Sequence, residues 1–106
     1  MKSGFALATS DEIARELGAR LRAQRIAQSL TQQQLAGRAG IAVGAVKTLE
    51  SSGRSTLATV VRVVQALALT AELETLLQPQ AQTSIAALER AELASKRQRV
   101  RRPRSA

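Results

Sequence analysis

Apolar residues recur every three or four positions along most of the chain, which is the spacing of one face of an α-helix. The first such segment runs from about Asp11 to Gln28. Ser10 is its expected N-cap, and the acids at its start favour the helix dipole. The positions predicted to be buried on this segment are Ile13, Leu17, Leu21 and Ile26.

Two short helices are predicted next. Thr31 is placed to cap a helix over Gln32–Ala39, which ends at Gly40, and another runs from Val43 to about Ser51. Two short helices joined by a sharp turn at a glycine form the pattern of a helix-turn-helix. The residues assigned to the core by their spacing are Leu35, Ala36, Ile41, Val46 and Leu49.

The apolar run LATVVRVVQALAL, residues 57–69, predicts a fourth helix that begins after Ser55 or Thr56. Its β-branched residues admit a strand, but its length and its period of about 3.6 residues favour a helix. Thr70 is the expected cap of a fifth helix over residues 70–77, which Pro79 closes.

These elements predict an all-α protein with a compact five-helix domain. The expected organisation is a flexible N-terminus over 1–9, the domain over 10–77, a linker over 78–83, and a weak helix with a basic tail over 84–106. The N-terminus lacks the apolar core of a signal peptide, and no stretch is long and apolar enough for a membrane span. We therefore expect a cytoplasmic protein with no membrane association.

Composition narrows the range of functions. The 106 residues include no Cys and no His, so disulfides, thiolate nucleophiles, imidazole bases and ordinary zinc sites are absent. We expect no metal and no cofactor. An enzyme would have to rely on scattered Glu residues, which makes catalysis the least favoured class of function.

The net charge of +8 predicts a polyanionic partner, and it is unevenly distributed. Residues 96–106 hold six of the sixteen basic residues and no acid, so the rest of the chain is nearly neutral. We interpret this tail first as an arm that contacts DNA phosphates. A segment that folds on an acidic protein, a membrane-surface anchor and a solvated run without a role remain alternatives. The basic residues of the arm are Lys96, Arg97, Arg99, Arg101, Arg102 and Arg104.

The stretch LRAQRIAQSLTQQQLAGRAGIAVGAVKTLESSG closely resembles the Cro and phage-repressor helix-turn-helix family, often called the XRE family. The resemblance rests on Arg25, LTQQQLA at 30–36, Gly40 and VKTLE at 46–50. The continuation STLATVVRVVQALAL looks more narrowly like HipB-type antitoxins, which partner a HipA-like kinase toxin. The resemblance spans about residues 15–77 and implies a lambda-repressor-like fold and a sequence-specific repressor of double-stranded DNA.

The resemblance also implies roles for individual residues. The second helix of the motif enters the major groove, which makes Val43, Gly44, Lys47 and Thr48 the candidates for reading bases. Ala42 replaces the Ser or Thr that usually caps this helix, and Gly44 offers no side chain. Specificity could therefore depend on DNA shape and dimer spacing. The candidates for phosphate contact are Thr31, Gln32, Arg38, Arg54, Ser55 and Thr56.

Each of these assignments has a simpler alternative. Thr31, Ser55 and Thr56 are good helix caps in any helical protein, Gln32 suits a solvated first turn, and Arg38 suits a solvated face. In the resembling family an Arg and a Glu at Arg25 and Glu50 pair with each other, so these two are expected to be structural.

Relatives of this class act as two-fold dimers on palindromic operators, so we expect a homodimer. The candidate interface residues are Leu69, Leu73, Leu76 and Leu77, which could equally close the core of a monomer. The leading hypothesis is the autoregulating antitoxin of a toxin-antitoxin pair. A free-standing phage-type or restriction-modification regulator, and an adaptor that binds protein instead of DNA, are the alternatives.

Overall fold

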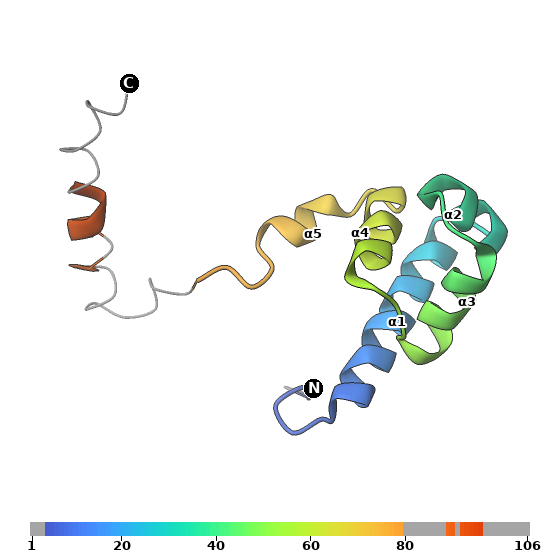
Figure 1. Ribbon diagram of the computed structural model, residues 1–106, viewed down its shortest axis with the longest axis horizontal. Helices are drawn as coiled ribbons and strands as arrows, with labels where there is room; N and C mark the ends of the chain where they lie inside the picture. Colours follow the sequence, from blue (N-terminus) through green and yellow to red (C-terminus); the bar gives the residue numbers. More distant parts are fainter. Residues whose placement is uncertain (1–3, 80–88, 91, 97–106) are drawn as a thin grey trace. The chain divides into compact units, whose positions relative to one another are not determined.

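The computed structural model describes residues 4–79, 89–90 and 92–96, and every regular element within these ranges is a helix. The named elements are α1 (Ser10–Ala27), α2 (Gln32–Ala39), α3 (Val43–Ser52), α4 (Leu57–Ala66) and α5 (Thr70–Glu74), shown in Figure 1. The prediction of an all-α protein is confirmed. The chain divides into two units, residues 1–74 and 75–106, and all five named helices belong to the first.

Side-chain caps decide where three of the helices begin. Thr9, not Ser10, caps α1: its hydroxyl accepts from the Glu12 amide at 3.1 Å, and the Glu12 carboxylate accepts from the Thr9 amide. The prediction for Ser10 is wrong by one position, because Ser10 is already the first helical residue. Thr31 caps α2 through its hydroxyl, as predicted. Of the two residues left open for the fourth helix, Thr56 and not Ser55 caps α4.

Two glycines end helices in the left-handed conformation that other residues rarely adopt. Gly40 (φ 71°) ends α2, and Gly53 (φ 78°) ends α3. Gly53 is also closely packed, since a Cβ there would collide with the backbone of Ala14 on α1. These two turns set the direction in which α3 leaves α2 and in which the chain enters α4.

The predictions for the fourth and fifth helices are too long. The α4 helix ends at Ala66, because Ala68 turns left-handed with φ 60° and redirects the chain after Leu67. Thr70 is the first residue of α5 and not its cap, and α5 ends at Glu74. Periodicity alone did not reveal this break, because Ala68 and Leu69 continue an apolar run.

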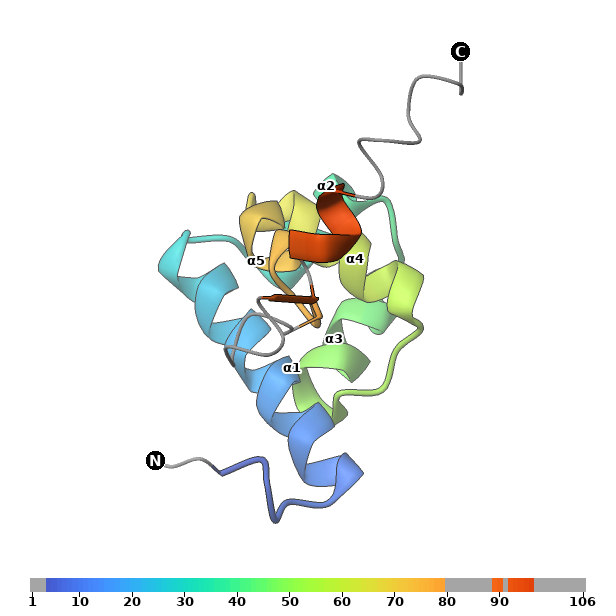
Figure 2. The same cartoon turned by 90° about the vertical axis from the view of Figure 1, so that its left-hand side faces the viewer.

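The core lies where α2 meets its neighbours. Helix α3 packs against both α1 and α2, and α2 packs against α4 (Figures 1 and 2). The five residues assigned to the core from the two short motif helices and their turn all take part, with Ile41 partly buried at the margin. The buried apolar residues are Leu30, Leu35, Ala36, Ala39, Val46, Leu49, Val63, Val64 and Leu67.

The buried face of α1 matches the prediction in part, because Ile13 and Leu21 are half-buried and Leu21 packs against the core. Leu17 and Ile26 were predicted to be buried, but they are 45% and 48% exposed. Gly18 and Arg25 are buried instead, and a Cβ at Gly18 would collide with the Leu49 carbonyl oxygen. The close approach of α1 to α3 therefore excludes larger side chains from the contact and moves the apolar ones to its edges.

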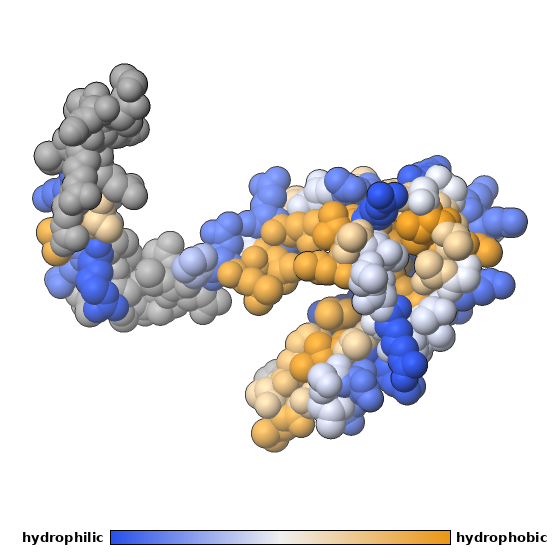
Figure 3. Space-filling view, viewed as in Figure 1, coloured by the Kyte–Doolittle hydropathy of each residue, from blue (hydrophilic) through white to orange (hydrophobic). Residues whose placement is uncertain are grey.

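Apolar surface remains open on the first unit, and Figure 3 shows it in orange on α1 and α4. Leu7 and Leu57 are the most exposed of its large apolar side chains, at 98% and 76%. Within the described residues, no helix has both the length and the hydropathy needed to cross a membrane.

Candidate nucleic-acid interface

The turn between α2 and α3 positions the candidate interface. The Ile41 amide donates to the Ala36 carbonyl at 3.0 Å across the left-handed Gly40, which closes the end of α2. The chain then reverses within three residues and starts α3 at Val43. This geometry brings the first turn of α3 next to the first turn of α2.

A shallow hollow of about 310 Å³ lies between these two first turns. The structure thus brings Val43 and Lys47, predicted to read bases, together with two residues predicted to contact phosphate. The residues that line the hollow are Thr31, Gln32, Gln33, Val43 and Lys47. Sequence reasoning did not select Gln33, because three consecutive glutamines at 32–34 give no sign of which one faces α3.

The exposed surface of α3 carries few polar groups. Gly44, Lys47 and Thr48 are exposed, and Val43 is half-buried, with part of its side chain packed against the core. Nothing lies within 4 Å of the place where a Cβ on Gly44 would stand. Ala42 makes no side-chain cap, as its residue type predicted. Lys47 therefore supplies the only charge among the four candidates for reading bases.

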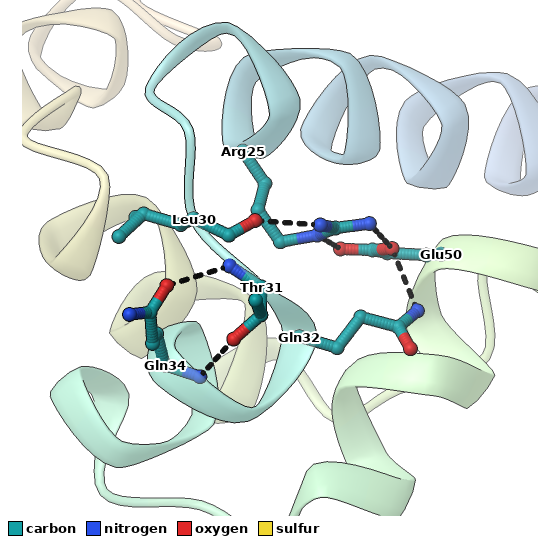
Figure 4. Close-up of polar contacts among 6 residues, drawn as sticks. All are labelled: Arg25, Leu30, Thr31, Gln32, Gln34 and Glu50. Carbon is teal, nitrogen blue, oxygen red and sulfur yellow. Dashed lines mark hydrogen bonds and ion pairs between the residues drawn. The ribbon is translucent and has the colours of Figure 1, made fainter.

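A buried ion pair holds Gln32, one of the residues that line the hollow (Figure 4). Arg25 Nε donates to Glu50 Oε2 at 2.7 Å, and Arg25 Nη2 donates to Glu50 Oε1 at 3.0 Å. The third guanidinium nitrogen donates to the Leu30 carbonyl at 2.7 Å. Gln32 Nε2 donates to Glu50 Oε1 at 3.0 Å, so one carboxylate ties α1, α2 and α3 together.

These contacts shift the pKa of both partners. Burial raises the pKa of the Glu50 carboxyl, but hydrogen bonds from Arg25 and Gln32, and the positive charges of Arg25 and Arg22, outweigh it and leave the pKa lowered. The hydrogen bond to Glu50 raises the pKa of Arg25 against the opposing effect of burial. Both residues are therefore charged in the folded protein at neutral pH, and their predicted structural role agrees with this geometry.

The first turn of α2 is fixed by its own hydrogen bonds. The Thr31 hydroxyl accepts from the Gln34 amide at 3.0 Å, and Gln34 Oε1 accepts from the Thr31 amide at 2.9 Å (Figure 4). This reciprocal capping box uses the side chain of Gln34. The side chain of Gln32 is held separately, by Glu50. Gln33 makes no side-chain hydrogen bond among the described residues.

Three further phosphate candidates lie at the connection between α3 and α4, outside the residues that line the hollow. Arg54 and Ser55 are exposed there. Thr56 is the N-cap of α4, where its hydroxyl accepts from the Thr59 amide and donates to Thr59 Oγ1, both at 3.1 Å. The simpler interpretation of Thr56 as a cap therefore accounts for its hydroxyl, whereas Arg54 keeps an exposed positive charge.

The remaining candidates are scattered. Arg38 is exposed in the last turn of α2, where a positive charge is favourable. Leu69 packs against the core and Leu73 is half-buried, whereas Leu76 and Leu77, in the second unit, are 56% and 91% exposed. Of the basic arm only Lys96 is described, and it is exposed; Arg97, Arg99, Arg101, Arg102 and Arg104 lie outside the described residues.

In the described part of the chain, no group of acidic side chains is arranged to hold a metal ion. Among curated proteins, none matches the chain. Residues 16–77, more than half of the chain, match the family model of a helix-turn-helix domain. The match covers α2, α3 and the turn between them, so the protein belongs to the helix-turn-helix domain family, of the XRE/Cro-like type.

Proposed function

We propose that this protein is a sequence-specific DNA-binding transcriptional regulator that represses by occupying an operator. The observation that carries the proposal is the hollow between α2 and α3, where Val43 and Lys47 of the second motif helix lie beside the capped first turn of the helix before it. A helix-turn-helix uses this arrangement to insert its second helix into the major groove.

In this arrangement α3 reads the bases. The Lys47 ammonium donates to guanine O6 or N7, the Val43 methyl groups pack on a thymine methyl, and the Thr48 hydroxyl either donates or accepts. Gly44 contributes no side chain, so the backbone of α3 can come close to the groove floor there. Lys47 is the polar contact on which discrimination depends most.

Phosphate contacts position the domain without reading sequence. Exposed positive charges at Arg38 and Arg54 lie at the end of α2 and before α4. The first turn of α2, at Thr31 and Gln32, presents backbone N–H groups that can bind a phosphate. The first turn of α4, which follows Ser55 and Thr56, presents backbone N–H groups in the same way. The basic arm that begins at Lys96 would add sequence-independent affinity and steepen the salt dependence.

We further propose that the protein binds as a homodimer to a palindromic operator, with two α3 helices about 34 Å apart on one face of the DNA. A single short α3 with few polar groups reads too few bases to select one site. Leu76 and Leu77 are the interface candidates that keep exposed apolar surface, whereas Leu69 already serves the core.

A fluorescence-anisotropy titration tests the proposal, with the full chain against its own upstream DNA and a scrambled duplex of equal length, between about 50 and 200 mM salt. We expect tighter binding to the upstream DNA that persists at the higher salt. Lys47→Ala should abolish this preference. Arg15→Ala is the matched control, because it removes one exposed positive charge from α1 outside the motif. Equal binding to both duplexes that vanishes with salt would refute a sequence-specific regulator.

The finer assignment as an antitoxin rests on the resemblance of residues 55–69 to HipB-type proteins. Co-purification with the product of a neighbouring HipA-like kinase gene tests it, and the absence of such a gene favours a free-standing regulator. Lys47→Ala separates both from an adaptor: an unchanged phenotype with partner binding retained would show that the fold no longer acts through DNA.

A further inference from the structure

We infer that Gln33 is a base-reading residue and that, with Val43, it selects an A·T base pair in the half-site. The inference rests on the proposed DNA-binding function. It adds a specificity-determining residue from α2 to a surface that would otherwise consist of α3 alone.

Gln33 lies next to the proposed base-reading residues of α3. Gln33 is exposed on the first turn of α2 and lines the same hollow as Val43 and Lys47. Its side chain therefore stands beside the two α3 residues best placed to face the bases.

The side-chain amides of the three consecutive glutamines differ in their hydrogen bonds. Gln32 Nε2 is bonded to the buried Glu50, and Gln34 Oε1 is bonded to the Thr31 amide. Of these three consecutive glutamines, only Gln33 has both its donor and its acceptor unused by the hydrogen bonds of the described residues. A free amide is the group that can form two hydrogen bonds to one base edge.

The turn of α2 that carries Gln33 is held in place by hydrogen bonds on both sides. The capping box between Thr31 and Gln34 holds the turn that carries Gln33, and the contact of Gln32 with Glu50 ties that turn to α3. The backbone under Gln33 is therefore fixed relative to Val43 and Lys47 before DNA binds. Direct readout of bases requires a backbone that holds the reading side chains in place before DNA binds.

The chemistry of the hollow then points to an A·T pair. Adenine presents N7 as an acceptor and N6 as a donor in the major groove, and a Gln amide complements both. Thymine presents its C5-methyl group, which packs on an apolar side chain such as Val43. A G·C pair would offer no methyl group to Val43 and would oppose the acceptor of the amide with guanine O6.

The test begins with selection of duplexes from a library with randomised half-sites, using the full chain. Wild type should enrich a fixed A·T pair at one half-site position. Gln33→Ala should lose the preference there by about fivefold to 150-fold and keep the other positions. Gln65→Ala is the matched control, because it truncates an exposed glutamine on α4 that does not line the hollow. Urea unfolding of both variants establishes that each retains its fold.

Base analogues then identify the contact at the selected site. Replacement of the adenine by 7-deazaadenine removes the N7 acceptor and should weaken wild type but not Gln33→Ala. Replacement of the thymine by deoxyuridine removes only the methyl group and should weaken wild type but not Val43→Ala.

Three results would overturn the inference. A uniform loss of affinity across all sequences, with a salt slope smaller by about one, would make Gln33 a phosphate contact. If Gln33→Ala selects the same sequences as wild type, the Gln33 side chain has no role in specificity. If wild type selects no sequence at all, the proposed function fails together with the inference, which distinguishes this case from the other two.

Discussion

Arg25 on α1 and Glu50 on α3, which are 25 positions apart in the chain, form a two-hydrogen-bond ion pair at 2.7 and 3.0 Å. Both residues are buried, at 8% and 6% exposure. The pair fixes α3 against the end of α1, and Gln32 extends it to the start of α2. The candidate DNA-binding surface therefore depends for its position on a buried charged pair that joins all three helices.

Removal of one member of this pair should be costly, because the other charge is left buried without its partner. We expect Arg25→Ala to lower the free energy of unfolding by about 3–5 kcal/mol in urea. Arg20→Ala is the control, because Arg20 pairs with Glu16 at 2.9 Å on the surface and lies over the Phe5 ring at 5.1 Å, and these two exposed contacts together should contribute no more than about 1.5 kcal/mol. Similar losses in the two variants would contradict the structural role of Arg25.

Stability should fall in acid through Glu50. The pKa of Glu50 is lower in the folded protein than in the unfolded chain, so on acidification the unfolded chain takes up the proton first. Glu50 therefore contributes to the free energy of unfolding at pH values above its pKa in the unfolded chain, which is about 4.3. This stabilisation is lost as the pH falls below the pKa of the unfolded chain and then through the lower pKa of the folded protein. Glu50→Gln should be less stable than wild type at pH 7, and the difference should shrink towards pH 3 in urea unfolding. Glu72→Gln, at an exposed site on α5, is the control and should parallel wild type.

Replacement by alanine should change the free energy of unfolding in opposite directions at two glycines. Gly53→Ala places a Cβ against the Ala14 backbone at a φ of 78°, so we expect a loss of at least about 2 kcal/mol. Gly37 lies within α2 with nothing within 4 Å of the added methyl group, so Gly37→Ala should gain about 0.5–1 kcal/mol. Thermal and urea unfolding measure both, and a stabilised Gly53→Ala would contradict the close approach of α1 to this turn.

The cap of α1 gives a comparison between adjacent residues. Thr9→Ala removes the hydroxyl that accepts from Glu12 and should cost about 1 kcal/mol. Ser10→Ala changes the first helical residue and should have little effect in the same unfolding measurement. A larger loss of stability for Ser10→Ala than for Thr9→Ala would show that Ser10 is the cap.

Sequence reasoning reached the site only in part. Val43, Lys47, Thr31 and Gln32 were selected from the motif, and the structure gathers all four around one hollow. Sequence reasoning did not select Gln33. The angle between α2 and α3 decides which of the three adjacent glutamines faces α3, and the sequence does not show that angle. Arg54, Ser55 and Thr56 were grouped with that set, but they lie at the separate connection before α4.

The sequence by itself determined the helices, the helix-turn-helix and most of the core. Those features follow from local causes: apolar spacing of 3.6 residues, threonines that cap, and glycines that can turn left-handed. Only the tertiary structure decided which face of α1 is buried and where α4 ends. The approach of α1 to α3 at Gly18 displaces Leu17 to an exposed position, and the left-handed turn at Ala68 breaks an apolar run that reads as one helix. The buried face of α1 depends on the distance between helices far apart in the chain, which no local pattern encodes.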